Sequence, residues 1–185
     1  VRRSLVREIR PDEYDIHDLV RDYIYDRIPP NKLRSLHDRI ARYYLEDPVD
    51  PRSLLEAIYH LIRAKRVDDA VEMAVERSDL LKPLAGEFQA VLSSIRQHDV
   101  DPGTWSEILL IRGDLAIRLG ELDQAMELYE QNLEAVLIRG ERGRVAGIYN
   151  KLGNVCGLKG DWERTVQYHL KAAEIYREMG DDRGL

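Results

Sequence analysis

Cysteine is nearly absent from this chain of 185 residues, which contains only Cys156. One thiol cannot form an internal disulfide framework or a multi-cysteine metal site, and such low cysteine use fits a reducing compartment. The sequence also lacks an apolar run of the roughly 18 residues that a membrane span needs. Its first residues, Val1, Arg2 and Arg3, do not lead into a signal peptide. We therefore expect a cytoplasmic fragment of a longer protein, without membrane contact.

Catalytic and phosphate-binding patterns are missing as well. No glycine-rich loop ends in Gly-Lys-Ser/Thr, and no nucleophile, base and oxyanion donors are recognisable as a set. His37 and His60 lie in helical patterns without a zinc-site spacing, and we interpret them as structural, as we do Cys156. We predict that this fragment is not an enzyme and holds no metal and no cofactor.

An excess of positive charge is lacking too, since the net charge is -6 at pH 7. The chain as a whole is therefore not expected to bind polyanions, and nucleic acid is the less favoured partner. Residues 1–44 differ from the rest, with 10 Lys and Arg against 8 Asp and Glu. Any contact with phosphate is expected in this N-terminal part.

An internal repeat is present, with an offset of 40 residues between residues 108–125 and residues 148–165. Each copy has a small residue where two helices must approach closely, and a second glycine that suits the left-handed end of the first helix. These positions are Gly113 and Gly153, then Gly120 and Gly160. The pattern predicts two helical hairpins, over about residues 106–145 and 146–185.

The repeat resembles the tetratricopeptide repeat, in a form of roughly 40 residues. Two positions depart from the pattern: Arg112 replaces a leucine and Thr165 replaces a small alanine. The resemblance implies antiparallel hairpins stacked as a superhelix, with the first helix of each hairpin lining the concave face. It therefore implies a protein or peptide as the partner.

The sequence divides into three regions, of which the last forms the repeat array. We predict repeats in residues 102–185 and a helical connector in residues 47–101, which holds a hairpin over residues 53–74 and a helix over residues 83–97. Residues 1–46 contain alternating apolar and polar residues before His17, typical of a small β-hairpin, and then two helical segments, from about 17 to 28 and from 33 to 44. A strand pair that runs into a helix is typical of a wing, so we interpret residues 1–46 as a winged-helix remnant. The predicted fold is otherwise all-α.

The segment from Tyr14 to Arg21 contains Ile16-His17-Asp18. It resembles the Met-His-Asp signature of the winged helix in signal-transduction ATPases with numerous domains, with Ile16 in place of Met. The resemblance implies that His17, followed by Asp18, contacts the β-phosphate of ADP in the intact protein, so that ATP or ADP would bind only through an upstream domain. The alternative is that both residues only cap the helix that follows.

We expect the partner to bind on the concave face of the repeats. Its expected residues are Asn150 and Asn154 in the second repeat and Asp114 and Ile117 in the first, with Arg118 as a cationic edge. An asparagine amide can bind a peptide backbone with both its donor and its acceptor, and two asparagines one turn apart are unfavourable for helix formation. The alternative is that these side chains are only solvated.

Together these patterns favour an interaction and sensor module of a larger signalling ATPase, which binds a peptide or protein on the repeats. The alternative is a transcription regulator whose winged helix contacts DNA, supported by Arg2, Arg3, Arg7 and Arg10.

Overall fold

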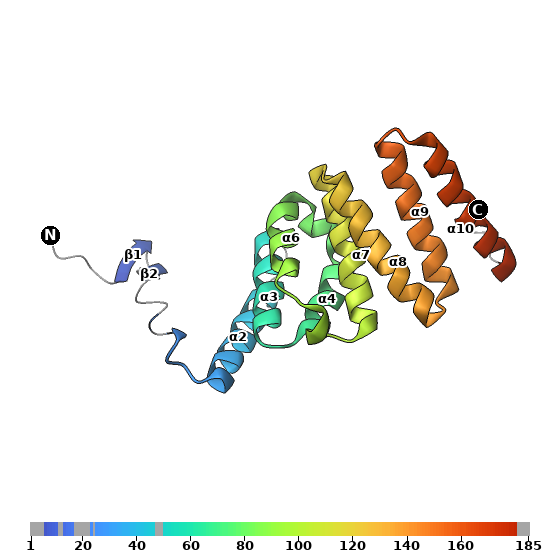
Figure 1. The fold of residues 1–185 in the computed structure, drawn as a ribbon. Helices are drawn as coiled ribbons and strands as arrows, with labels where there is room; N and C mark the ends of the chain where they lie inside the picture. The colour runs from blue at the N-terminus through green and yellow to red at the C-terminus, as the bar shows by residue number, and fades with distance from the viewer. Residues whose placement is uncertain (1–5, 11–12, 17–22, 24, 47–49, 181–185) are drawn as a thin grey trace.

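The computed structural model describes residues 6–10, 13–16, 23, 25–46 and 50–180. Most of residues 30–180 lie in helices, which follow one another side by side toward the C-terminus (Figure 1). The predicted helical architecture is confirmed for this part of the chain.

The described residues before α2 contain one antiparallel strand pair, β1 (Val6–Arg10) with β2 (Glu13–Ile16). The register shifts between Glu8 and Arg10, which marks a bulge. His17 and Asp18 lie outside the described residues, as does most of the helix predicted to follow them. A strand pair alone does not define a winged helix, so that interpretation of residues 1–46 stays a prediction.

Prolines and an aspartate determine where the next helices begin. α2 (Pro30–Leu45) and α3 (Pro51–Arg63) both start at a proline, whose missing N–H is not needed in the first turn. Asp50 caps α3 by accepting the Ser53 amide at 3.1 Å. α3 and α4 (Val67–Glu76) form the hairpin predicted over residues 53–74.

The helix predicted over residues 83–97 is shorter than expected. The chain forms a single turn, α5 (Ser78–Leu81), then a 3-10 turn (Lys82–Leu84), and α6 spans only Ala85–Ser93. Pro83 lacks the amide proton that a continuous α-helix would use there. At the other end, Ser93 and Ser94 donate their hydroxyls to backbone carbonyls one turn earlier, at 2.7 Å each, and a second 3-10 turn (Gln97–Asp99) follows.

The two predicted repeats form the hairpins α7–α8 and α9–α10. Their helices span Pro102–Leu119, Leu122–Arg139, Arg142–Leu158 and Trp162–Met179. Gly120, Gly140, Gly160 and Gly180 follow the four helices with φ between 69° and 79°, where only glycine is free of strain. The turns therefore recur every 20 residues, as the sequence repeat requires.

The small residues inside each hairpin lie at close helix contacts, as predicted. A β-carbon on Gly113 would overlap the ring of Tyr129 in α8, and one on Gly153 would lie 2.9 Å from the ring of His169 in α10. Residues 40 positions apart thus play the same part, with an aromatic side chain of the second helix over a glycine of the first.

Two hydrophobic cores lie along the array and share α7. The first core includes Ile108 and Leu115 of α7 with residues of α2 to α6, and the second includes Leu109 and Ala116 with residues of α8 and α9. Because opposite faces of α7 are buried in different cores, this helix fixes the connector against the repeats.

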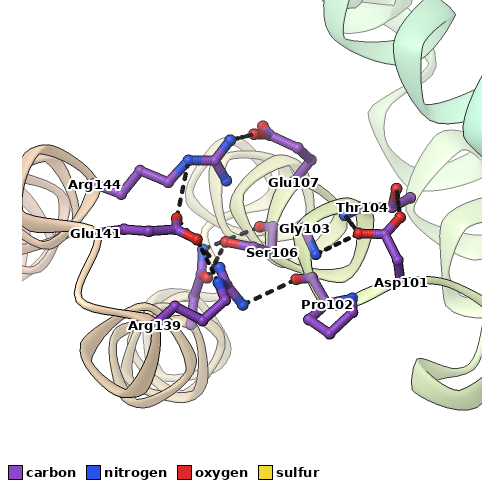
Figure 2. Close-up of polar contacts among 10 residues, drawn as sticks. Asp101, Pro102, Gly103, Thr104, Ser106, Glu107, Arg139, Glu141 and Arg144 are labelled. Carbon is purple, nitrogen blue, oxygen red and sulfur yellow. Dashed lines mark hydrogen bonds and ion pairs between the residues drawn. The ribbon is translucent and has the colours of Figure 1, made fainter.

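Polar contacts at the start of α7 cap this helix and link it to α8 and α9 (Figure 2). Asp101 accepts the backbone amides of Gly103 and Thr104, at 2.7 and 3.2 Å. Arg139, at the end of α8, donates to the Pro102 carbonyl oxygen at 3.1 Å. Arg144 of α9 forms an ion pair with Glu107 of α7 at 2.5 Å, so that the charge of this carboxylate is balanced.

One buried polar pair distinguishes the first hairpin from the second. Ser106 donates its hydroxyl to the Asn132 side-chain oxygen at 2.5 Å, and Asn132 donates back to the Ser106 carbonyl at 3.0 Å. Both residues are fully buried. The equivalent residues of the second hairpin are Ala146 and Ala172, also buried. Both members of the pair are replaced together, which leaves no orphaned polar group.

Candidate functional site

A groove lies where the connector meets the first repeat, with a cavity of about 520 Å³. One wall comes from α4, α5, the start of the 3-10 turn and Phe88 of α6 (Ala85–Ser93), and the other comes from α7 and one residue of α9. Its apolar lining is Val75, Phe88, Leu110, Ile111, Leu115 and Ile117. Its polar lining is Ser78, Asp79, Lys82, Glu107, Asp114, Arg118 and Lys151.

Three of the predicted site residues line this groove together: Asp114, Ile117 and Arg118. They lie on one face of α7 because residues three and four apart share a face of a helix. The structure therefore brings these three residues together, and their role in partner binding stays a prediction.

Asp114 is held in place by two donors. The hydroxyl of Tyr129 donates to its carboxylate at 2.5 Å, and Lys151 of α9 lies 2.6 Å from the same oxygen. Tyr129 is fully buried, and burial together with the Asp114 carboxylate raises the pKa of its phenol above the ordinary value. Tyr129 therefore stays a donor, and Asp114 links the two repeats on the groove side.

The charges on the groove are mostly paired. Lys82 pairs with Asp79, Lys151 with Asp114, and Arg144 with the groove residue Glu107. Within the described part of the chain, Arg118 has no ion-pair partner within 4 Å. Its guanidinium is thus the groove cation available to an acidic ligand.

The two predicted asparagines lie outside the lining of this cavity. Asn150 is half-buried, and its side-chain oxygen lies 3.0 Å from Nδ1 of His169 in α10. Asn154 is exposed. Asn150 therefore contributes to the contact between α9 and α10, and a role of either asparagine in partner binding stays a prediction.

Sequence reasoning did not find the opposite wall of the groove, formed by Val75, Ser78, Asp79 and Lys82. These residues have no equivalent in the 40-residue repeat. The signal in the sequence was Val75, an apolar residue directly after the hairpin predicted over residues 53–74; in the structure it is 45% exposed.

A second apolar surface lies on α10, where Trp162, Val166 and Leu170 are 70%, 57% and 64% exposed. The equivalents of the first two in α8 are Leu122 and Met126, which pack in the second core. The open face of α10 is thus equivalent to the face of α8 that packs against α9. It is a second surface, besides the groove, on which a partner could bind.

Residues suited to chemistry are sparse in the described residues. No cluster of three or more His, Cys, Asp or Glu side chains within that part could hold a metal ion. Cys156 is buried, and burial raises the pKa of its thiol, consistent with a structural role. Across the described helices, none is both long and apolar enough to cross a membrane. His17 and Asp18, the predicted nucleotide-sensing residues, lie outside the described residues.

Comparison with protein-family models gives no match, and comparison with curated proteins gives no significant match. Among solved structures, the chain is similar to BtubC (BKLC) from P. vanneervenii, with 19% identity over 83% of this chain and a TM-score of 0.43. It spans 59% of the length of that structure. It is also similar to MamA MSR-1 C2, with 14% identity, a TM-score of 0.36, and coverage of 88% of this chain and 99% of the other. At these TM-scores neither similarity defines a function.

Proposed function

We propose that this chain is a protein-interaction module whose groove binds a short segment of a partner protein. The observation that carries the proposal is the composition of the groove. The exposed Val75 and the half-buried Leu110, Ile111 and Ile117 form an apolar lining, and the exposed Arg118 beside it has no ion-pair partner within the described residues. Such a surface suits a segment with one large apolar side chain and a nearby carboxylate.

The apolar lining would supply most of the affinity, because apolar area removed from water is worth about 25 cal/mol per Å². Arg118 would orient the segment by a charge-assisted hydrogen bond to its carboxylate. The other groove charges are already balanced by neighbours, so they contribute less to the choice of partner.

Selection from a random peptide library against this chain tests the proposal. We expect enrichment of peptides with an aromatic or leucine side chain near an aspartate or glutamate. Arg118→Glu and Val75→Glu change opposite walls of the groove, and each should weaken the selected peptides by about tenfold or more. Arg177→Glu is the matched control, since Arg177 is exposed on α10 away from the groove. Equal weakening by the control would contradict the proposal.

The second repeat extends the proposal. If a bound segment continues along α9, it reaches Asn154, and Asn154→Ala should weaken binding of the full-length protein to its partner by about 1–3 kcal/mol without loss of stability. Loss of stability with unchanged affinity would assign Asn154 to the fold instead.

We also propose that this chain is part of a signal-transduction ATPase with numerous domains. In that protein the repeats would sense a partner and an upstream module would bind ATP or ADP. The support is the Ile16-His17-Asp18 motif and its position before the helical hairpins. The coding sequence upstream of Val1 is the test, and it should contain a P-loop. A complete helix-turn-helix without a P-loop would favour the DNA-binding regulator.

A further inference from the structure

A second cavity, of about 290 Å³, lies away from the groove, between α2, the end of α3 and the segment that follows α6. Its apolar walls include Leu33, Tyr59 and Ile62. Three cations also line it: Arg34 from α2, Arg63 from the end of α3, and Lys65 from the turn after α3.

The positive charges of this cavity are only partly balanced. Its single acidic lining residue, Asp99, pairs with Lys65 at 3.3 Å. Arg34 and Arg63 have no acidic partner within 4 Å among the residues that the structure describes. This charge also affects a neighbouring histidine. Burial is the main reason why the pKa of His37 is lowered, and the positive charge of Arg63 lowers it further.

Lys65 adds an independent observation. It is the one described non-glycine residue with a positive φ, 64°. Its amide bonds to the Ile62 carbonyl at 3.0 Å, as the amide of Gly120 bonds to Ile117 at the end of α7. The turns after the repeat helices all use glycine at a positive φ. A lysine at such a position is strained, and strained backbone is concentrated at functional sites.

We propose that this cavity binds a small phosphate monoester, with Arg34 of α2 and Arg63 of α3 holding the phosphate and the paired Lys65 beside them. Two guanidinium groups match a dianionic tetrahedral group better than a monoanionic carboxylate, because each offers several donors in a planar fork. The apolar walls at Tyr59 and Leu33 would contact the organic part of the ligand.

Binding would also change the histidines beside the cavity. His37 lines it, and Nδ1 of His37 lies 2.6 Å from Nδ1 of His60. The other groups facing this pair are Tyr25, Tyr44, Tyr59 and Glu56, the last of these 3.9 Å from Nε2 of His60. A bound dianion would offset the charge of Arg63, so the pKa of His37 and His60 should rise.

Calorimetric titration with phenyl phosphate, inorganic phosphate and phenol tests the proposal on the whole chain, with proton NMR of the histidine rings as a second readout. Phenyl phosphate should bind and phenol should not. Arg34→Gln and Arg63→Gln should each weaken the binding of phenyl phosphate by about tenfold or more. Arg52→Gln, an exposed substitution on the same helix as Arg63, is the matched control. Circular dichroism shows whether each variant is folded.

Phenyl phosphate should also raise the histidine pKa values, and in Arg63→Gln about tenfold more phenyl phosphate or higher should be needed for the same change. Binding of inorganic phosphate as tight as that of phenyl phosphate would assign the site to the free anion and overturn the monoester. Equal affinity of Arg63→Gln and the unmodified chain, or no saturable binding up to about 10 mM, would overturn the site itself.

Discussion

Mild acid should destabilise this protein through His60. Burial lowers the pKa of His60 from 6.5 to about 4, and the charges of His37 and Arg63 act in the same direction. The side chain is only 14% exposed, and its Nδ1 shares a short hydrogen bond with Nδ1 of His37. Both rings cannot carry a proton on these atoms at once, so the pair cannot become doubly protonated without losing this bond.

The sign and size of the effect follow from linkage. The unfolded chain binds the proton near pH 6.5 and the folded chain only near pH 4, so stability is complete above about pH 6.5 and falls as the pH falls toward 4. One pH unit corresponds to about 1.4 kcal/mol, which gives about 3 kcal/mol over the whole window and about 2 kcal/mol between pH 7 and pH 5.

Urea unfolding at pH 7 and pH 5 measures this loss directly. His60→Asn keeps a polar atom near the Nδ1 position and removes the titration, so its stability should vary much less between the two pH values. His98→Asn is the matched control, because His98 is exposed, and it should retain the full loss. Carboxylates beside cationic neighbours, such as Asp38 and Glu141, have lowered pKa values. Their contribution to stability is lost only below about pH 5, so it does not affect this comparison. An unmodified chain equally stable at both pH values, or a His60→Asn chain with the same loss, would refute the reasoning.

Three further predictions concern stability. Gly153→Leu should lower the free energy of unfolding by about 1–3 kcal/mol through overpacking against His169. Gly86→Ala should not lower it, because a β-carbon there meets nothing within 4 Å. Thermal unfolding of both variants measures the difference. Gln89→Leu should raise it by about 1 kcal/mol in urea, because both polar atoms of the buried Gln89 amide lack a partner in the described structure, and a loss would mean that the amide is satisfied. Lys65→Gly should raise it by about 1 kcal/mol by relieving the positive φ, although the pair with Asp99 is lost; a clear loss would mean that this pair outweighs the strain.

The repeats could be predicted from the sequence because local chemistry determines them. Gly120 and Gly160 end helices with a positive φ, and Gly113 and Gly153 allow close helix contacts, so a 40-residue offset was enough to place both hairpins. The helix expected over residues 83–97 was too long, because its pattern did not show how Pro83 and the serines at 93 and 94 would interrupt it.

The groove could be predicted only on its α7 side. Asp114, Ile117 and Arg118 share a face of one helix, and that follows from spacing alone. The opposite wall depends on how α4 packs against α7, a contact between residues far apart in the sequence that no repeat equivalence describes. The pairing of His37 with His60 depends in the same way on the register of α2 against α3.

NMR mapping of a library-selected peptide on the labelled chain tests the central claim, that the groove is the partner site, most directly. Amide signals around Val75, Asp79, Ile117 and Arg118 should shift on titration, and Arg118→Glu should require about tenfold more peptide or higher for the same shifts. Shifts centred instead on the open face of α10, around Trp162, Val166 and Leu170, would contradict the account and place the partner there.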